Sequence, residues 1–157
     1  MSRFFRNFLV SFCFIGYIPY APGTVASIVA ALLYYFVLPE LSVPENLLFL
    51  LCIIALSLVL LPLIYRTEKE QGSDSQTIVI DEVIGYAVAV LFLPHTISVA
   101  IYALILFRIF DIIKPPPIYQ VQSLPHGVGV IADDIVAGIY SNIIIQILYL
   151  ISPKFFV

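Results

Sequence analysis

Acidic residues gather in three short clusters of this sequence, each next to a run without charged residues. The clusters are Asp81-Glu82, Asp111 and Asp133-Asp134. Carboxylates beside hydrocarbon are costly unless they are paired, bind a metal or face a polar cavity. Helix capping can explain the first and third clusters, but not Asp111, which follows an apolar run, where the helix dipole disfavours an acid. Oxygen ligands without cysteine favour a hard cation such as Mg²⁺.

Two basic residues share a predicted helix face with the central acid. Arg108, Asp111 and Lys114 are spaced three residues apart, which places them on one side of a helix. Three prolines at 115–117 end that helix, so Lys114 lies at its C-terminus. A lysine there can simply satisfy the helix dipole, but an Arg–Lys pair also suits phosphate, because Arg offers a planar fork and Lys a point charge.

Small residues at helical spacing indicate where helices approach one another closely. Gly23, Ser27 and Ala31 recur every four residues, and Gly85 and Gly138 each follow an acidic cluster by about one turn. The Pro-Gly-Thr sequence around Gly23 also begins a predicted helix, whose free N–H groups can receive a phosphate.

The composition indicates that lipid, rather than water, surrounds this chain. Of its 157 residues, 62% are hydrophobic and 11% are charged, whereas soluble domains are about 25% charged. Asp, Glu, Lys and Arg are absent from four stretches, 7–39, 47–65, 83–107 and 135–153. Each approaches or exceeds the roughly 20 residues that a membrane-spanning helix needs. The seven basic residues form no cluster of the kind that binds nucleic acid.

Glycines and prolines divide two of these stretches. Those between residues 16 and 23 interrupt the first, so we expect a broken or re-entrant segment and then a helix over about 24–38. The third carries Pro94 near its centre and is either one kinked span or a hairpin of two short helices. Only the hairpin keeps Asp81 and Lys114 on the same side of the membrane.

The charges in the loops indicate the orientation. The loop 39–46 carries no Lys or Arg, whereas the loop 66–76 carries Arg66 and Lys69, so the positive-inside rule places the second loop in the cytoplasm. With the hairpin, about five short transmembrane helices follow the N-terminal segment, and the acidic clusters face the cytoplasm. We therefore expect an all-α, polytopic membrane protein with a single domain over residues 1–157.

The two histidines have different surroundings. His95 lies in the predicted outer turn, where a structural role is expected. His126 precedes a glycine close to Asp133, which makes it a weaker candidate for a catalytic histidine.

Four ordered sequence blocks resemble the phosphatidylglycerophosphatase A family. The blocks are 21–27, 81–85, 107–115 and 127–138. Two positions depart from the usual family pattern, since Ala26 and His126 stand where glycine is frequent, but neither departure removes a charged group. The resemblance implies a bacterial inner-membrane, Mg²⁺-dependent lipid phosphatase. Such an enzyme hydrolyses phosphatidylglycerophosphate to phosphatidylglycerol and inorganic phosphate, in phospholipid biosynthesis.

The resemblance also implies the residues of the site. The implied metal ligands are Asp81, Glu82, Asp111, Asp133 and Asp134. Among them, the implied catalytic residues are Asp81, Asp111 and Asp134. The candidate phosphate-binding residues are Arg108 and Lys114, together with Gly23, Thr24 and Ser27 at the helix start. How many ions bind, and whether water or an aspartate attacks the phosphorus, stays open at this point.

Two other functions fit part of the pattern. A membrane alcohol phosphatidyltransferase would also gather aspartates around a divalent ion at the cytoplasmic surface, but the chain lacks the Asp-Gly-x-x-Ala-Arg run expected of such enzymes. A non-enzymatic cation transporter would place its acids in mid-helix, whereas the acids here lie at predicted helix ends beside Arg and Lys. Both remain alternatives, which an assay of phosphate release separates from the hydrolase.

Overall fold

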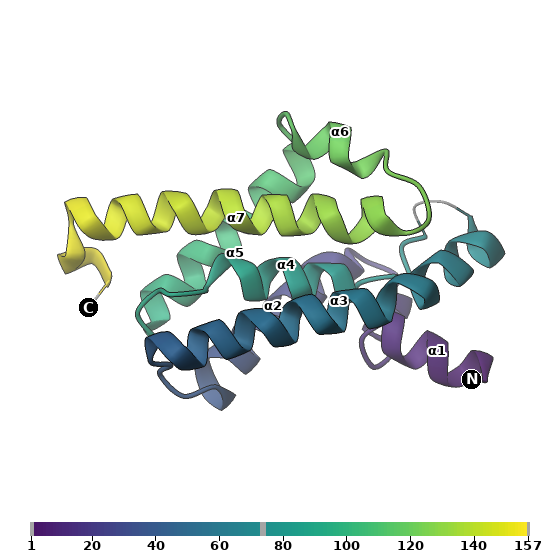
Figure 1. Cartoon of the computed structure of the whole chain (residues 1–157), viewed down its shortest axis with the longest axis horizontal. Coiled ribbons are helices and arrows are strands. Elements are labelled where there is room, and N and C mark those ends of the chain that lie inside the picture. Colours follow the sequence, from purple (N-terminus) through teal and green to yellow (C-terminus); the bar gives the residue numbers. More distant parts are fainter. Residues whose placement is uncertain (1, 73–74, 157) are drawn as a thin grey trace.

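The computed structural model describes residues 2–72 and 75–156, and all regular structure over these residues is helical (Figure 1). The α-helices are α1 (Arg3–Val10), α2 (Pro22–Val37), α3 (Val43–Gln71), α4 (Ile80–Ala89), α5 (Ile97–Ile113), α6 (Ile118–Gln122) and α7 (Val128–Ile151). Short 3₁₀ turns cover Ile15–Tyr17 and Pro153–Phe156. The all-α fold class is confirmed.

Helix α4 lies at the centre of the fold and packs most extensively on α7. Helices α2, α3 and α5 also contact it. The α4–α7 approach depends on two glycines, because a side chain at Gly138 would overlap the Gly85 carbonyl oxygen. At the far end of the same interface, the Asn142 side chain donates hydrogen bonds to the carbonyl oxygens of Ala89 and Leu91, at 3.0 and 2.8 Å. The close packing that the small residues predict at these two helices is therefore present.

The N-terminal segment is broken, as predicted. Helix α1 ends at Val10, and left-handed backbone at residues 12–14 turns the chain before α2 begins at Pro22. Arg6 is buried and donates two hydrogen bonds, of 2.7 and 2.6 Å, to the Glu70 carboxylate near the end of α3. The segment therefore packs against α3 instead of extending α2.

The third uncharged run forms a hairpin. Helix α4 ends at Ala89, α5 begins at Ile97, and the turn between them meets the end of α2 and the start of α3. There the Phe92 N–H donates to Asn46 Oδ1 at 2.9 Å, and a ring nitrogen of His95 lies 2.9 Å from the Tyr34 carbonyl oxygen. His95 thus has the structural role expected of it. The loop 39–46 and the turn at Pro94, both of which the sequence places outside, lie together.

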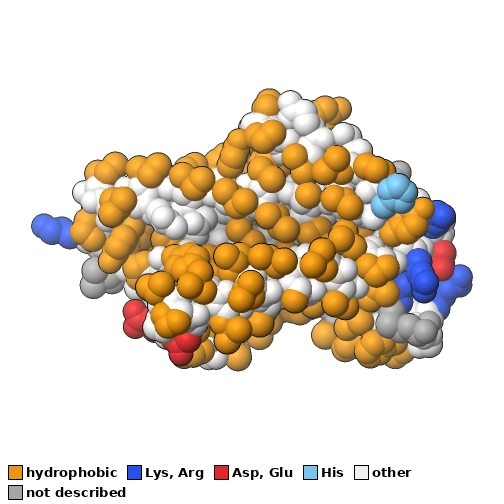
Figure 2. Space-filling view, in the orientation of Figure 1, with side chains coloured by type: hydrophobic (Ala, Val, Ile, Leu, Met, Phe, Trp, Pro, Cys, Tyr) orange, Lys and Arg blue, Asp and Glu red, His pale blue; other side chains and the backbone are white. Residues whose placement is uncertain are grey.

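Apolar side chains cover the length of the face seen in Figure 2, and charged side chains gather at its two ends. Two helices, α3 with 29 residues and α7 with 24, are long and apolar enough to cross a membrane. Exposed hydrophobic surface on this scale is unusual for a soluble monomer and is consistent with a membrane protein.

The count of five transmembrane helices is not confirmed. Besides α3 and α7, the apolar helix α2 has 16 residues and falls short of a full span. Helix α4 has ten residues, which extend about 15 Å, half of the roughly 30 Å hydrocarbon core. Seven of these ten residues are buried, so α4 serves as a core helix surrounded by the others.

Candidate functional site

A polar cavity of about 460 Å³ lies where α2, α4, α5 and α7 meet. Five carboxyl groups and two cationic side chains line it: Asp81, Glu82, Asp111, Asp133, Asp134, Arg108 and Lys114. The acids of α4 and α7 come from the first two turns of these helices, and the other three residues come from the C-terminal end of α5. The hairpin brings the first two acidic clusters together, and the packing of α7 on α4 and α5 adds the third.

The two cations connect acids from three helices. Arg108 Nη1 donates to Asp111 Oδ2 at 2.7 Å, and Lys114 Nζ lies 3.6 Å from Asp111 Oδ1. Lys114 also donates to Asp133 Oδ2, and Arg108 lies 3.9 Å from Glu82 Oε1. The helix face predicted from the three-residue spacing is thus confirmed, with Asp111 between the two cations.

Lys114 keeps its charge in this setting. Burial of its ammonium group lowers the pKa, but the hydrogen bond to Asp133 and the charges of Asp133 and Asp111 outweigh burial, so that the pKa of Lys114 lies above its usual value. Its backbone adopts a left-handed conformation, with φ of 47°, as the cap that ends α5 before the prolines. A positive charge is therefore fixed at the cavity wall.

Three buried carboxylate oxygens in the cavity have no hydrogen-bond partner among the described residues. They are Asp81 Oδ1, Glu82 Oε2 and Asp134 Oδ2. A buried carboxylate oxygen without a partner is costly unless a cation or a proton compensates it. Because five acids face only two bases here, the protein itself does not supply enough positive charge.

The spacing of the acids fits a hard divalent cation. Asp81, Glu82 and Asp134 offer oxygen atoms within 4.8 Å of one another, and these are the three acids of the cavity that have an unpartnered oxygen among the described residues. Asp111, Asp133 and Asp134 form a second group of the same kind. Carboxylate oxygens are the ligands that Mg²⁺ prefers in proteins, so the residues present fit this ion. Asp134 belongs to both groups.

The start of α2 forms another wall of the cavity. Gly23 and Thr24 line the cavity, and a Cβ atom at Gly23 would overlap the Glu82 carboxylate in its present position. Ser27 does not line the cavity. It is buried, and its hydroxyl donates to the Gly23 carbonyl oxygen at 2.8 Å, which makes it a packing residue of α2. Ser27 is thus the one candidate phosphate-binding residue that the structure does not place at the cavity.

Other polar residues of the cavity were not expected from the sequence. Ser75, Gln76 and Gln122 line it from the segments before α4 and at the end of α6. These residues stand in polar segments without a motif or a helical repeat, so no sequence signal identifies them. His126, by contrast, lies outside the cavity and packs its ring on Tyr65, with 5.1 Å between ring centroids. The structure gives it no catalytic position.

Comparisons with known proteins agree with the sequence blocks. The sequence model of a family described as Phosphatidylglycerophosphatase A matches residues 8–149. Phosphatidylglycerophosphatase A of Haemophilus influenzae is 34% identical over 133 residues, which cover 83% of this chain and 80% of that protein. Its namesake in Escherichia coli K12 is 34% identical over 129 residues, with coverage of 80% and 73%.

A third relative carries a different name. A protein of Bacteroides thetaiotaomicron, provisionally named as a phosphatidylinositol-3-phosphatase, is 34% identical over 143 residues, which cover 84% of this chain and 86% of that protein. No solved structure shows a significant match to the chain.

Proposed function

Because the chain belongs to the phosphatidylglycerophosphatase A family, and so is a phosphatase, we propose that it hydrolyses phosphatidylglycerophosphate to phosphatidylglycerol and inorganic phosphate. Water adds to the phosphorus, the bond from phosphorus to the glycerol oxygen breaks, and that oxygen takes up a proton. One observation carries the proposal: two cationic side chains, Arg108 and Lys114, and two groups of carboxylates face one cavity. Phosphomonoester cleavage needs this combination of positive charge and cation ligands.

We also propose that Mg²⁺ is the cofactor. Asp81, Glu82 and Asp134 are the first choice of ligands, because each has an oxygen without a partner, and Asp111 and Asp133 complete a second position with Asp134. When bound, the ion stabilises negative charge on the phosphoryl group. The unpartnered oxygens and the excess of acids support this proposal.

Arg108 and Lys114 bind the phosphate in this proposal. At present they are paired with Asp111 and Asp133. With a cation bound, Asp111 and Asp133 would serve as its ligands, and the guanidinium of Arg108 and the ammonium group of Lys114 would then be available to the phosphate. Gly23 and Thr24, at the first turn of α2, add backbone N–H groups close to Arg108.

A comparison of substrates tests the proposed reaction, since the relatives carry two names. We expect the purified protein in detergent micelles to release inorganic phosphate from phosphatidylglycerophosphate faster than from phosphatidylinositol 3-phosphate. Malachite-green detection of phosphate at equal lipid mole fractions measures both rates. A faster rate on the inositol lipid would reassign the substrate, and no release from either lipid would favour the phosphatidyltransferase or transporter alternatives.

We further propose a multi-pass protein of the bacterial inner membrane, folded as one membrane-embedded domain, with the cavity open to the cytoplasm. The loop charges support this orientation, as does the position of the polar cavity at the end opposite the turns around Asn46 and His95.

Cysteine labelling tests the orientation. In a variant without Cys13 and Cys52, a cysteine at Ser123 should react with a membrane-impermeant maleimide only in inverted vesicles, because Ser123 is exposed beside the cavity. A cysteine at Glu40, exposed at the opposite end, should react only in right-side-out vesicles. The reverse pattern would place the site outside the cytoplasm.

A further inference from the structure

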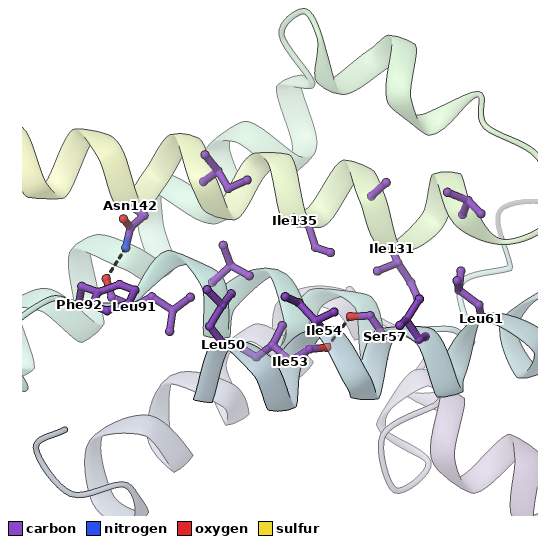
Figure 3. A pocket seen from close by; sticks show the side chains of 15 residues that line it. Leu50, Ile53, Ile54, Ser57, Leu61, Leu91, Phe92, Ile131, Ile135 and Asn142 are labelled. Atoms are coloured by element: carbon purple, nitrogen blue, oxygen red, sulfur yellow. Dashed lines mark hydrogen bonds between the residues drawn. The ribbon is translucent and has the colours of Figure 1, made fainter. Parts of the chain in front are cut away.

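A second hollow of about 460 Å³ lies between α3 and α7, with α4 as its floor (Figure 3). Aliphatic side chains form its walls, among them Ile54 and Leu61 of α3 and Ile131 and Ile135 of α7. No charged side chain lines it within the described part of the chain. We call this hollow the apolar groove.

The polar groups in the apolar groove are already satisfied. The Ser57 hydroxyl donates to the Ile53 carbonyl oxygen at 2.8 Å (Figure 3). The side-chain N–H groups of Asn142 donate to carbonyl oxygens at the end of α4 and in the turn after it. The side-chain oxygen of Asn142, Oδ1, accepts a hydrogen bond from Gln146 Nε2 at 2.7 Å. A hollow that offers no free donor or acceptor does not hold ordered water, so the groove suits hydrocarbon.

The groove has the length and position of a lipid chain. Its lining on α7 runs from Val128 to Asn142, which is about 21 Å of helix, enough for the roughly 15 Å of one membrane leaflet. Helices α3 and α7 are the two helices of membrane-spanning length, so the groove between them opens toward hydrocarbon.

One end of the apolar groove lies beside the polar cavity that contains the five acids, which we call the catalytic cavity. Ile131 and Ile135 of α7 face the groove, whereas Asp133 and Asp134 between them face the cavity on the other side of the helix. The first turns of α7 thus separate a site for phosphate from a site for hydrocarbon.

A third hollow, partly polar, lies around the N-terminal end of α7, beside the catalytic cavity. It has a volume of about 420 Å³ and is lined by Tyr65, Glu68 and Lys69 of α3 and by residues 122–126. Gln122 lines both this hollow and the catalytic cavity. On the other side, Tyr65 follows the groove residue Leu61 by one turn of α3.

We propose that the apolar groove binds an acyl chain of the lipid substrate while its terminal phosphate lies in the catalytic cavity. The glycerol and phosphodiester part of the lipid then crosses the polar hollow at the start of α7. This inference rests on the proposed function and adds to it the place where the enzyme holds the hydrophobic part of its substrate.

Two matched tryptophan variants test the groove. Ile54 and Leu56 are both 47% exposed on α3, but only Ile54 lines the groove. We expect Ile54→Trp to lower kcat/KM for dipalmitoyl phosphatidylglycerophosphate about tenfold, the factor for losing contact with about two buried methylenes. The rate on the dibutyryl analogue should be unchanged, because its chains are too short to fill the groove. Leu56→Trp should leave both rates near those of the wild-type protein.

Ser57→Leu provides a second way to fill the groove, from its α3 wall, and should give the same chain-length-dependent loss if Ile54→Trp does not fold. Equal losses on both substrates, or equal behaviour of Ile54→Trp and Leu56→Trp, would overturn the acyl-chain site while leaving the proposed function intact. A wild-type protein that hydrolyses neither lipid would instead overturn the proposed function, and the groove inference with it.

Discussion

Replacing Asp134 by Asn is expected to lower phosphate release by about a hundredfold or more, the size of effect seen when one preorganised electrostatic contact is lost from a transition state. Asp134 is the acid shared by both carboxylate groups, so its loss weakens either position for the cation. Asn keeps the size of the side chain but removes the ligand charge. Phosphate release measured over a range of Mg²⁺ concentrations tests this expectation.

Stability measurements distinguish loss of the ion from loss of the fold. Without Mg²⁺, Asp134→Asn should unfold at the same temperature as the wild-type protein or higher, because it relieves an excess of buried negative charge. Mg²⁺ should raise the melting temperature of the wild-type protein more than that of the variant, since a ligand stabilises the state that binds it. Glu40→Gln, an exposed acid at the opposite end, is the control and should change neither quantity. A wild-type rate for Asp134→Asn at saturating Mg²⁺ would contradict the metal site.

Arg108→Ala and Lys114→Ala are each expected to lower kcat/KM by tenfold to a hundredfold. Each substitution removes a charge-assisted hydrogen bond to phosphate. Such a bond contributes roughly 1.5–3 kcal/mol, which lowers kcat/KM when the bond is present in the transition state. Lys154→Ala is the control, because Lys154 is exposed in the turn after α7, far along the chain from the cavity. Kinetics on phosphatidylglycerophosphate in mixed micelles, at matched amounts of folded protein, provide the measurement.

The comparison between Lys114 and Lys154 decides the role of the first. Equal kcat/KM values for the two alanine variants would reduce Lys114 to a residue that satisfies the C-terminus of α5 and pairs with Asp133. The phosphate-binding role would then fall to Arg108 and the start of α2.

The charged half of the site could be predicted from the sequence because few charges occur in this chain. An acid next to a long apolar run is costly, so each such acid indicates a site or an ion pair. The three-residue spacing of Arg108, Asp111 and Lys114 then fixes a shared face, which the structure shows. Pro94 predicts the turn that brings Asp81 back to this face.

The remaining features depend on contacts that a pattern does not contain. An uncharged run looks the same whether lipid or other helices surround it. The sequence therefore predicts a membrane crossing for the run that holds α4, whereas α4 has ten residues and seven of them are buried. Ser27 has the spacing of a residue that faces the site, but its hydroxyl bonds to its own helix. Gln122 reaches the cavity only because α6, the short helix after the prolines, packs on α7.

Dependence of phosphate release on Mg²⁺ tests the central claim most directly. The purified protein, freed of divalent ions with EDTA in detergent micelles, should release no phosphate from phosphatidylglycerophosphate above the rate of the Asp134→Asn variant. Addition of Mg²⁺ in excess of the chelator should restore the rate. Full hydrolysis in the presence of EDTA would contradict a cation site formed by Asp81, Glu82, Asp111, Asp133 and Asp134.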